Sequence, residues 1–296
     1  MQSILSRAHK QSIQREPFPH IIVENALEKS LYASLAGTFP STEVIAGNKT
    51  LKNQKMGLNA VNLLKNNAIS QKWQDFIAYH SSPEFFSEVL DIFGDEIRAL
   101  YPFLEKDFRK PLTDLNTTRR ITAERKTTHR SDEVVLDCQV MVDDTSDPRI
   151  CRGPHVDAVE EIFAGLLYFR HPEDQSNGGD LCVLRAKDSE ELFPHEGAIR
   201  VDQRPAEIED AKTEIVTQVP YVENTAIFFI NSPKSLHKVT MRTASPIPRR
   251  HVNIIGESYS LKQRGLFQIL NPGVSFQPAA PPSLIRRAIN KLRRSF

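Results

Sequence analysis

The strongest constraint on the fold is a change of hydrophobic pattern near residue 134. From there to residue 258 the sequence is a succession of short segments that are rich in β-branched residues and either alternating or fully apolar. About eight such segments follow one another, separated by turn residues such as Asn177-Gly178-Gly179. A run of this kind predicts a β-sandwich or β-barrel.

The residues before this run have a helical pattern. Apolar residues four apart predict a helix from an N-cap at Asn25 to about residue 39, and further helices are predicted over 70–108. Residues 41–66 and 109–133 are polar without a clear period, and we interpret them as loops. We expect the helices to brace the outside of the β structure. The predicted strands are 17–25, 134–142, 162–169, 180–185, 214–219, 225–230, 236–240 and 249–258.

Bulk properties exclude several classes of protein. The net charge of the 296-residue chain is +1, which gives no general attraction to nucleic acid, and no nucleic-acid partner is expected. The three cysteines show no CxxC spacing, which argues against a disulfide framework and fits a reducing cytoplasm. The N-terminus lacks a secretory h-region, and no apolar run is long enough to span a bilayer.

The domain organisation predicted from these patterns is simple. We expect a single domain over 1–271, with helical support at about 17–133 and a β core at about 134–260. A Pro-rich segment and a basic amphipathic helix follow at 272–296. Packing of that helix on the domain, or fraying of it in solution, is favoured, and contact with a membrane surface or nucleic acid is the alternative. The sequence gives no prediction of oligomeric state.

One short stretch carries the chemistry. His155 and Asp157 are two residues apart, so on an extended segment their side chains point the same way. His237 follows a distant predicted strand and could supply a third ligand. Two imidazoles and one carboxylate on one face of an ion, with the other face open, are typical of non-heme Fe(II) oxygenases.

The order of motifs in the second half resembles the 2-oxoglutarate- and Fe(II)-dependent dioxygenases, in particular their prolyl 4-hydroxylase-like branch. The resemblance covers about 135–258 and implies a double-stranded β-helix (jelly-roll) barrel with the metal inside its mouth. The matching segments are 155–157 (HVD), 166–170 (LLYFR), 178–181 (GGDL), 224–230 (NTAIFFI), 235–239 (SLHKV) and 249–253 (RRHVN).

The resemblance implies an activity as well as a fold. Fe(II) would be held by His155, Asp157 and His237, which together would form the catalytic centre. The reaction would also require dioxygen and the cosubstrate 2-oxoglutarate. The resemblance further implies ascorbate as a cofactor. The implied reaction is oxidative decarboxylation of 2-oxoglutarate to succinate and CO2, coupled to hydroxylation of a peptidyl proline, an amino acid or a small molecule.

The far carboxylate of 2-oxoglutarate needs a cation, and a guanidinium suits it because it can bond both oxygens. Arg249 and Arg250 are the candidates. We favour Arg249, because it would share the inner face of its strand with His251 and it places a hydrophobic residue where the family usually has one. Tyr168 matches a position that often hydrogen-bonds 2-oxoglutarate, and core packing is the alternative.

A second class of function remains open. The same fold could serve as a non-catalytic metal-binding β-barrel that acts as a sensor or binding module. A site that binds Fe(II) but not 2-oxoglutarate would favour it.

Overall fold

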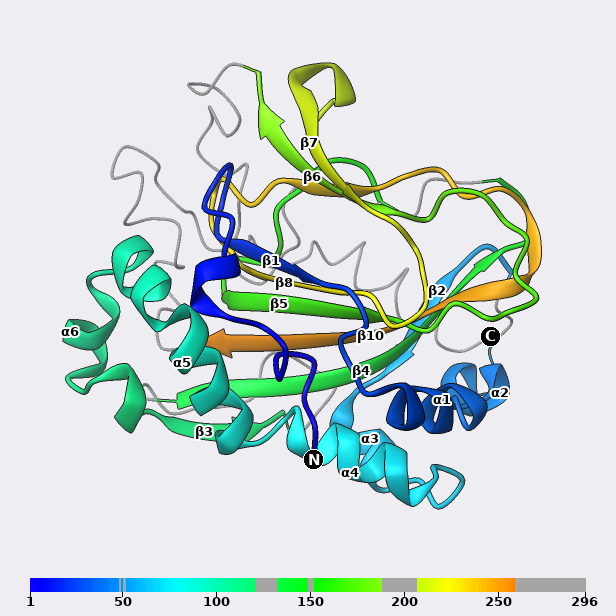
Figure 1. Ribbon diagram of the computed structural model, residues 1–296, viewed down its shortest axis with the longest axis horizontal. Coiled ribbons are helices and arrows are strands. Elements are labelled where there is room, and N and C mark those ends of the chain that lie inside the picture. The colour runs from blue at the N-terminus through cyan, green and yellow to red at the C-terminus, as the bar shows by residue number, and fades with distance from the viewer. Residues whose placement is uncertain (48, 50–51, 121–132, 149–151, 188–206, 259–296) are drawn as a thin grey trace, which may run out of the picture.

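The computed structural model describes residues 1–47, 49, 52–120, 133–148, 152–187 and 207–258 of the chain. It is mainly β, with helices gathered along one side of the larger of two sheets (Figure 1). The helices are α1 (Lys29–Gly37), α2 (Thr42–Ala46), α3 (Ala60–Leu64), α4 (Gln71–Tyr79), α5 (Pro83–Leu100) and α6 (Leu104–Phe108). The strands are β1 (His20–Val23), β2 (Lys55–Leu58), β3 (Asn116–Arg119), β4 (Glu133–Thr145), β5 (Glu161–Tyr168), β6 (Leu181–Ala186), β7 (Thr213–Val219), β8 (Ala226–Ile230), β9 (His237–Val239) and β10 (Ser245–Ser258).

Chain order and sheet order differ strongly. The described part of the larger sheet runs β1-β8-β5-β10-β4-β2, with β3 paired in parallel beside β4, and the smaller one runs β7-β6-β9. The last strand, β10, lies in the middle of the larger sheet between β4 and β5. Almost every pairing therefore joins strands that are far apart in the chain. The segments that carry the predicted ligands His155 and His237 likewise become neighbours only through such long-range pairing.

Alternation along β10 separates two hydrophobic cores. Val252 and Ile254 belong to the core between the sheet and the helices, where Phe228 packs against Phe85 and Phe93 with ring centroids 6.4 and 5.3 Å apart. Residues of the opposite parity face the second core, between the two sheets, whose members are Phe18, Ala164, Tyr168, Leu181, Val183, Val219, Tyr221, Ile227, Phe229 and Ile255. This period of two is what places a defined set of β10 side chains in the interior.

The strand predictions from residue 134 onward are confirmed to within a few residues. The predicted barrel is not closed, because the described strands form two separate sheets with edges at β1, β2 and β7. The sequence-predicted segment 272–296 lies outside the described residues.

The predicted helix that ends near residue 39 is present, but the prediction of its N-cap at Asn25 is wrong. The helix α1 begins at Lys29 after the N-cap Glu28, and Asn25 has a positive φ of 50°. The amide of Ala26 donates to the carbonyl of Asn224 over 2.9 Å, so these residues are tied to a distant turn instead of opening a helix.

The prediction of a loop over 41–66 is also wrong. It contains α2, β2 and α3, and β2 pairs with β4 so that Lys55 lies opposite Asp143. Such short elements have no detectable period and depend on long-range pairing. Within the predicted loop 109–133, β3 pairs with β4, and residues 121–132 lie outside the described residues.

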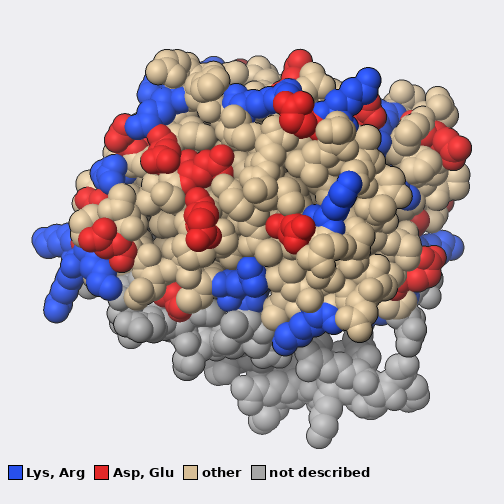
Figure 2. All heavy atoms as spheres, turned by 60° about the horizontal axis from the view of Figure 1, so that its bottom comes forward, with Lys and Arg blue, Asp and Glu red and all other residues tan. Residues whose placement is uncertain are grey.

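The outer surface on the helical side mixes both signs of charge. Figure 2 shows Lys and Arg side chains interspersed with Asp and Glu over that face. None of the described helices combines the length and the apolar character that crossing a bilayer requires.

Candidate metal centre

The two predicted histidine ligands are neighbours across a backbone ladder. The amide of His155 donates to the carbonyl of His237 over 3.0 Å, and the amide of His237 donates back to the carbonyl of His155 over 2.9 Å. This isolated bridge extends the smaller sheet beyond β9. The two imidazole centroids are 4.3 Å apart as a result.

Each imidazole is held in one tautomer. The Nδ1 of His155 lies 2.7 Å from the carbonyl oxygen of Gly153, and the Nδ1 of His237 lies 2.9 Å from that of Ser235. A carbonyl oxygen can only accept, so Nδ1 carries the proton in both rings. The Nε2 lone pairs are therefore available, which is the arrangement that second-sphere carbonyls give to metal-binding histidines.

The carboxylate of Asp157 completes the group. Its Oδ1 is 3.8 Å from Nε2 of His155 and its Oδ2 is 3.6 Å from Nε2 of His237. The three possible ligand atoms all lie within 4.8 Å of one another. Arg152, which lines the same cavity as these three residues, approaches Oδ1 of Asp157 to 3.6 Å through its Nη1. The residues present thus fit a divalent ion with two nitrogen ligands and one oxygen ligand.

The electrostatics keep both imidazoles neutral. Burial lowers the pKa of His155 far below its ordinary value, and the proximity of His237 and of the Arg152 cation lowers it further. Burial also lowers the pKa of His237, although the Asp157 carboxylate opposes this shift. Neutral imidazole is the form that binds metals, so both rings are in the protonation state that a metal ligand needs.

The loop before His237 is tied to the segment after Asp157 by one buried amide. Asn231 is fully buried, and its Nδ2 donates to the carbonyls of Ala158 (2.9 Å) and Glu161 (3.0 Å). Its Oδ1 accepts from the Ser235 hydroxyl over 2.8 Å. The side chain therefore fixes the distance between the two ligand-bearing segments.

The three candidate ligands open into a cavity of about 380 Å³ between the sheets. Its wall contains polar residues from β4 and β10, including Gln139 and Asn253, whose side chains are joined by a 3.4 Å hydrogen bond. The residues that line it are Lys55, Arg120, Gln139, Arg152, His155, Asp157, Ala158, Glu161, Leu166, Leu181, His237, Val239, Arg249, His251, Asn253 and Ile255.

The two arginine candidates lie on opposite faces of β10. Arg249 lines the cavity and is only 2% exposed, whereas the guanidinium of Arg250 lies over the Phe39 ring at 5.2 Å on the helical side. The guanidinium carbon of Arg249 is 5.0 Å from the ring centroid of Tyr168 and 5.1 Å from that of Tyr221. Aromatic faces stabilise a buried cation in this way.

Tyr168 does not itself line the cavity. It is fully buried beside Arg249, and its hydroxyl has no hydrogen-bond partner among the residues that the structure describes. Burial raises the pKa of Tyr168 to about 12, although the positive charge of Arg249 opposes the shift. A neutral hydroxyl of this kind can donate to an anion held by Arg249.

A tight glycine turn holds Arg249 from the other side. The Nε of Arg249 donates to the carbonyl of Gly179 over 2.8 Å. Gly178 and Gly179 have φ values of 78° and 82°, and a Cβ on Gly178 would lie 1.9 Å from the carbonyl oxygen of Met241. Only glycine fits such a backbone and such an approach.

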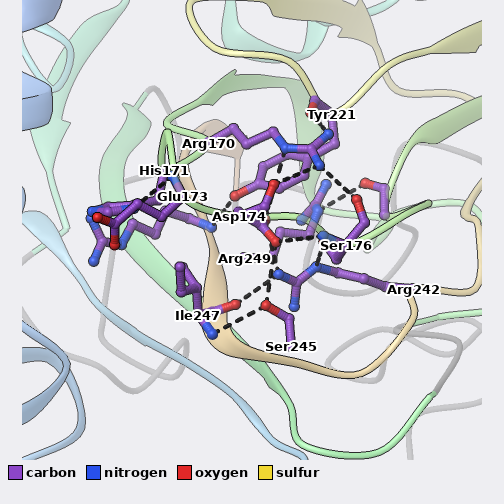
Figure 3. Close-up of polar contacts among 12 residues, drawn as sticks. Arg170, His171, Glu173, Asp174, Ser176, Tyr221, Arg242, Ser245, Ile247 and Arg249 are labelled. Atoms are coloured by element: carbon purple, nitrogen blue, oxygen red, sulfur yellow. Dashed lines mark hydrogen bonds and ion pairs between the residues drawn. The ribbon is translucent and has the colours of Figure 1, made fainter.

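Behind this turn, a buried ion pair fixes the surrounding loops (Figure 3). Arg242 Nη2 lies 2.9 Å from Oδ2 of Asp174, and Arg242 also donates to the Ser176 hydroxyl over 2.9 Å. Asp174 accepts from the amide of Ser176 over 3.0 Å and from the Ser245 hydroxyl over 3.3 Å. The side chains of this network are hydrogen-bonded to one another and to the backbone. Its role is therefore structural: it stabilises the conformation of the glycine turn.

The sequence missed several residues of the cavity wall. Lys55 lies in a segment whose sequence pattern indicates a loop. Gln139 lies on a predicted strand; alternation predicts the direction of its side chain, but not which strand pairs beside it. Arg152 stands three residues before His155, and that proximity was the signal available.

Comparison with known proteins gives structural similarity at low identity. A Pseudomonas putida prolyl-4-hydroxylase has 10% identity and a TM-score of 0.42, with 81% of this chain and 92% of that chain covered. The non-heme alpha ketoglutarate-dependent epimerase SnoN from nogalamycin biosynthesis has 11% identity and a TM-score of 0.44, with 85% and 79% covered. A Trichoplax adhaerens prolyl hydroxylase, in complex with a hypoxia inducible factor peptide fragment, has 9% identity and a TM-score of 0.40, with 82% and 85% covered.

No family model matches the sequence, and no curated protein matches it. The functional proposal is therefore built on the residues of the site.

Proposed function

We propose that this chain is a Fe(II)- and 2-oxoglutarate-dependent dioxygenase that hydroxylates its substrate. One observation carries the proposal: the Nε2 atoms of His155 and His237 and a carboxylate oxygen of Asp157 lie within 4.8 Å of one another, at a cavity that Arg249 also lines. Two histidines and one carboxylate with open positions opposite are the donor set of non-heme Fe(II) oxygenases.

The strand order supports a double-stranded β-helix. Counting the His155 segment as the second of eight, the core strands of the larger sheet run first, eighth, third, sixth (β4-β10-β5-β8). The smaller sheet then runs second, seventh, fourth, fifth (His155 segment, β9, β6, β7). This interleaving is the jelly-roll pattern, and it supports a site at the cavity that His155 and His237 line from the smaller sheet and Arg249 lines from the larger one.

The protein's own contribution is binding and orientation. When bound, Fe(II) supplies the redox chemistry by which 2-oxoglutarate, dioxygen and a substrate C–H group become succinate, CO2 and the hydroxylated substrate. The Gly153 and Ser235 carbonyls keep the imidazoles of His155 and His237 turned toward the ion. Arg249, flanked by two aromatic rings, binds the far carboxylate of 2-oxoglutarate in a water-poor setting.

The substrate would occupy the remaining part of the cavity. Its wall there carries the hydrogen-bonded pair Gln139 and Asn253, which supports a substrate with polar groups. A peptidyl proline, a free amino acid and a polar small molecule all meet this condition. Ascorbate would act as a reductant that maintains the ferrous state.

The test is formation of succinate from 2-oxoglutarate by the purified, Fe(II)-loaded protein. Activity should be lost in His155→Ala and in Asp157→Ala and retained in His9→Ala, which changes an exposed histidine. A loaded protein that neither binds nor consumes 2-oxoglutarate would overturn the proposal. Tight Fe(II) binding without any 2-oxoglutarate binding would assign the non-catalytic metal-binding module instead.

A further inference from the structure

One buried donor in the cavity has no acceptor within the part of the chain that the structure describes. His251 is fully buried in the middle of the larger sheet and lines the cavity beside Arg249, and its Nε2 makes no hydrogen bond to any described residue. A buried polar group without a partner costs about 1–3 kcal/mol, so such groups are rare and point to a missing ligand.

The tautomer of His251 follows from its contact with Arg249. Nδ1 of His251 lies 3.2 Å from Nη1 of Arg249. A guanidinium can only donate, so Nδ1 must be the acceptor and the ring proton must sit on Nε2. Burial, together with the charges of Arg249 and Lys55, lowers the pKa of His251 well below its ordinary value, so the ring is neutral and carries a single N–H.

That N–H makes no hydrogen bond to its cross-strand neighbours in the described part of the sheet. In the sheet register, His251 stands between Met141 of β4 and Tyr168 of β5. A thioether is a weak acceptor at best, and the Tyr168 hydroxyl is itself a buried group without a partner. The His251 N–H and the Tyr168 hydroxyl therefore both lie beside the guanidinium of Arg249. A carboxylate has enough lone pairs to accept a hydrogen bond from each of them.

We propose that His251 is a cosubstrate-binding residue, whose Nε2–H donates to the same carboxylate that Arg249 binds. The inference rests on the proposed function, because it assigns the far carboxylate of 2-oxoglutarate as that ligand. Arg249 has two roles in this arrangement: it binds the carboxylate, and through Nη1 it fixes the tautomer that makes His251 a donor.

Two ligands of equal chain length isolate this contact. 2-Oxoglutarate ends in a carboxylate, and 2-oxopentanoate ends in a methyl group. Their affinities are measured by isothermal titration calorimetry with the full chain loaded with Mn(II), which does not support turnover. The quantity of interest is the ratio of the two affinities, because general damage to the site lowers both.

The expected result is a loss confined to 2-oxoglutarate. His251→Phe should weaken its binding about 10- to 100-fold, as for loss of a hydrogen bond to a charged group, and change 2-oxopentanoate binding less than about 2-fold. His251→Gln retains an N–H near the position of Nε2 and should bind within about 5-fold of wild type. His251→Asn keeps only an acceptor near Nδ1 and should resemble His251→Phe.

Each contrary outcome has a distinct meaning. Equal losses for both ligands, or equal behaviour of His251→Gln and His251→Asn, would reduce His251 to a packing role and overturn the inference. If wild type and His251→Phe bind 2-oxoglutarate equally well, the inference about His251 is overturned and the proposed function stands. Wild type that binds no 2-oxoglutarate would remove both. Should His251→Phe fail to fold, the Gln and Asn pair still decides.

Discussion

His155 and His237 exchange both of their backbone hydrogen bonds, at 3.0 and 2.9 Å, although one precedes β5 and the other opens β9. The separation of the two imidazoles is therefore set by main chain, not by side-chain packing alone. Loss of either side chain should leave this ladder in place, so ligand variants should remain folded.

Removal of a ligand should abolish metal binding without unfolding the chain. His237→Ala should reduce the affinity for Mn(II) by more than about 100-fold, which exceeds the usual effect of losing an outer-sphere partner. Titration calorimetry measures the affinity and circular dichroism the fold. His9→Ala, at an exposed position, is the matched control and should bind as wild type does. Undiminished binding by His237→Ala would place the metal elsewhere.

The two adjacent arginines should differ sharply in their effect on 2-oxoglutarate. Arg249→Gln removes a cation that lines the cavity and should weaken 2-oxoglutarate binding at least about 100-fold. Arg250→Gln removes a cation that lies over Phe39 on the other face and should change binding less than about 3-fold. Equilibrium binding to the Mn(II)-loaded protein distinguishes them. A larger loss in Arg250→Gln would reverse the assignment.

Asn231 should contribute to both stability and metal affinity. Asn231→Ala removes three hydrogen bonds at a fully buried position and should lower the free energy of unfolding by about 2–4 kcal/mol. Because the two ligand-bearing segments lose their tie, Mn(II) affinity should fall about 10-fold. Urea unfolding and metal titration give the two values. Asn67→Ala, at an exposed position, should alter neither.

Gly178 should tolerate no side chain. Gly178→Ala would combine a positive φ of 78° with a Cβ 1.9 Å from a backbone oxygen, so the turn must move. We expect a loss of about 2–4 kcal/mol in the free energy of unfolding. Gly37→Ala is the control, because a Cβ there meets nothing within 4 Å. An equally small effect in both variants would show that the turn is not constrained.

Acid should destabilise the protein through a buried histidine far from the metal centre. His80 is fully buried; it accepts from the amide of Ile4 and lies 2.8 Å from the carbonyl of Phe76. Burial lowers its pKa to about 3 from its ordinary value of 6.5, with the Phe76 hydrogen bond opposing the shift. The unfolded chain therefore binds more protons between those pH values, and stability that is complete above pH 6.5 declines as the pH falls toward 3.

The size of that acid effect is on the order of 5 kcal/mol for the full shift. His80→Gln keeps a neutral donor and acceptor, so its unfolding free energy should vary less between neutral and mildly acidic pH. Urea unfolding of the metal-free protein at several pH values measures the slope. His9→Gln should retain the wild-type slope. An unchanged slope in His80→Gln would assign the acid sensitivity to other groups.

Local pattern was sufficient for much of the fold. Alternation along β10 predicted that Arg249, His251 and Asn253 share a face, and all three line the cavity. The two-residue spacing of His155 and Asp157 likewise brought their ligand atoms together. The segment 41–66 was misread because β2 and α3 are too short to show a period and are held by pairing and packing against distant elements.

The sequence by itself determined which residues alternate toward the interior, since side-chain direction along a strand depends only on a local period of two. The tertiary structure decided which interior residues meet: that His237 lies beside His155, and that Lys55 reaches the same cavity. These pairings are made by hydrogen bonds between segments far apart in the chain, and no local pattern encodes which distant segment becomes the neighbour.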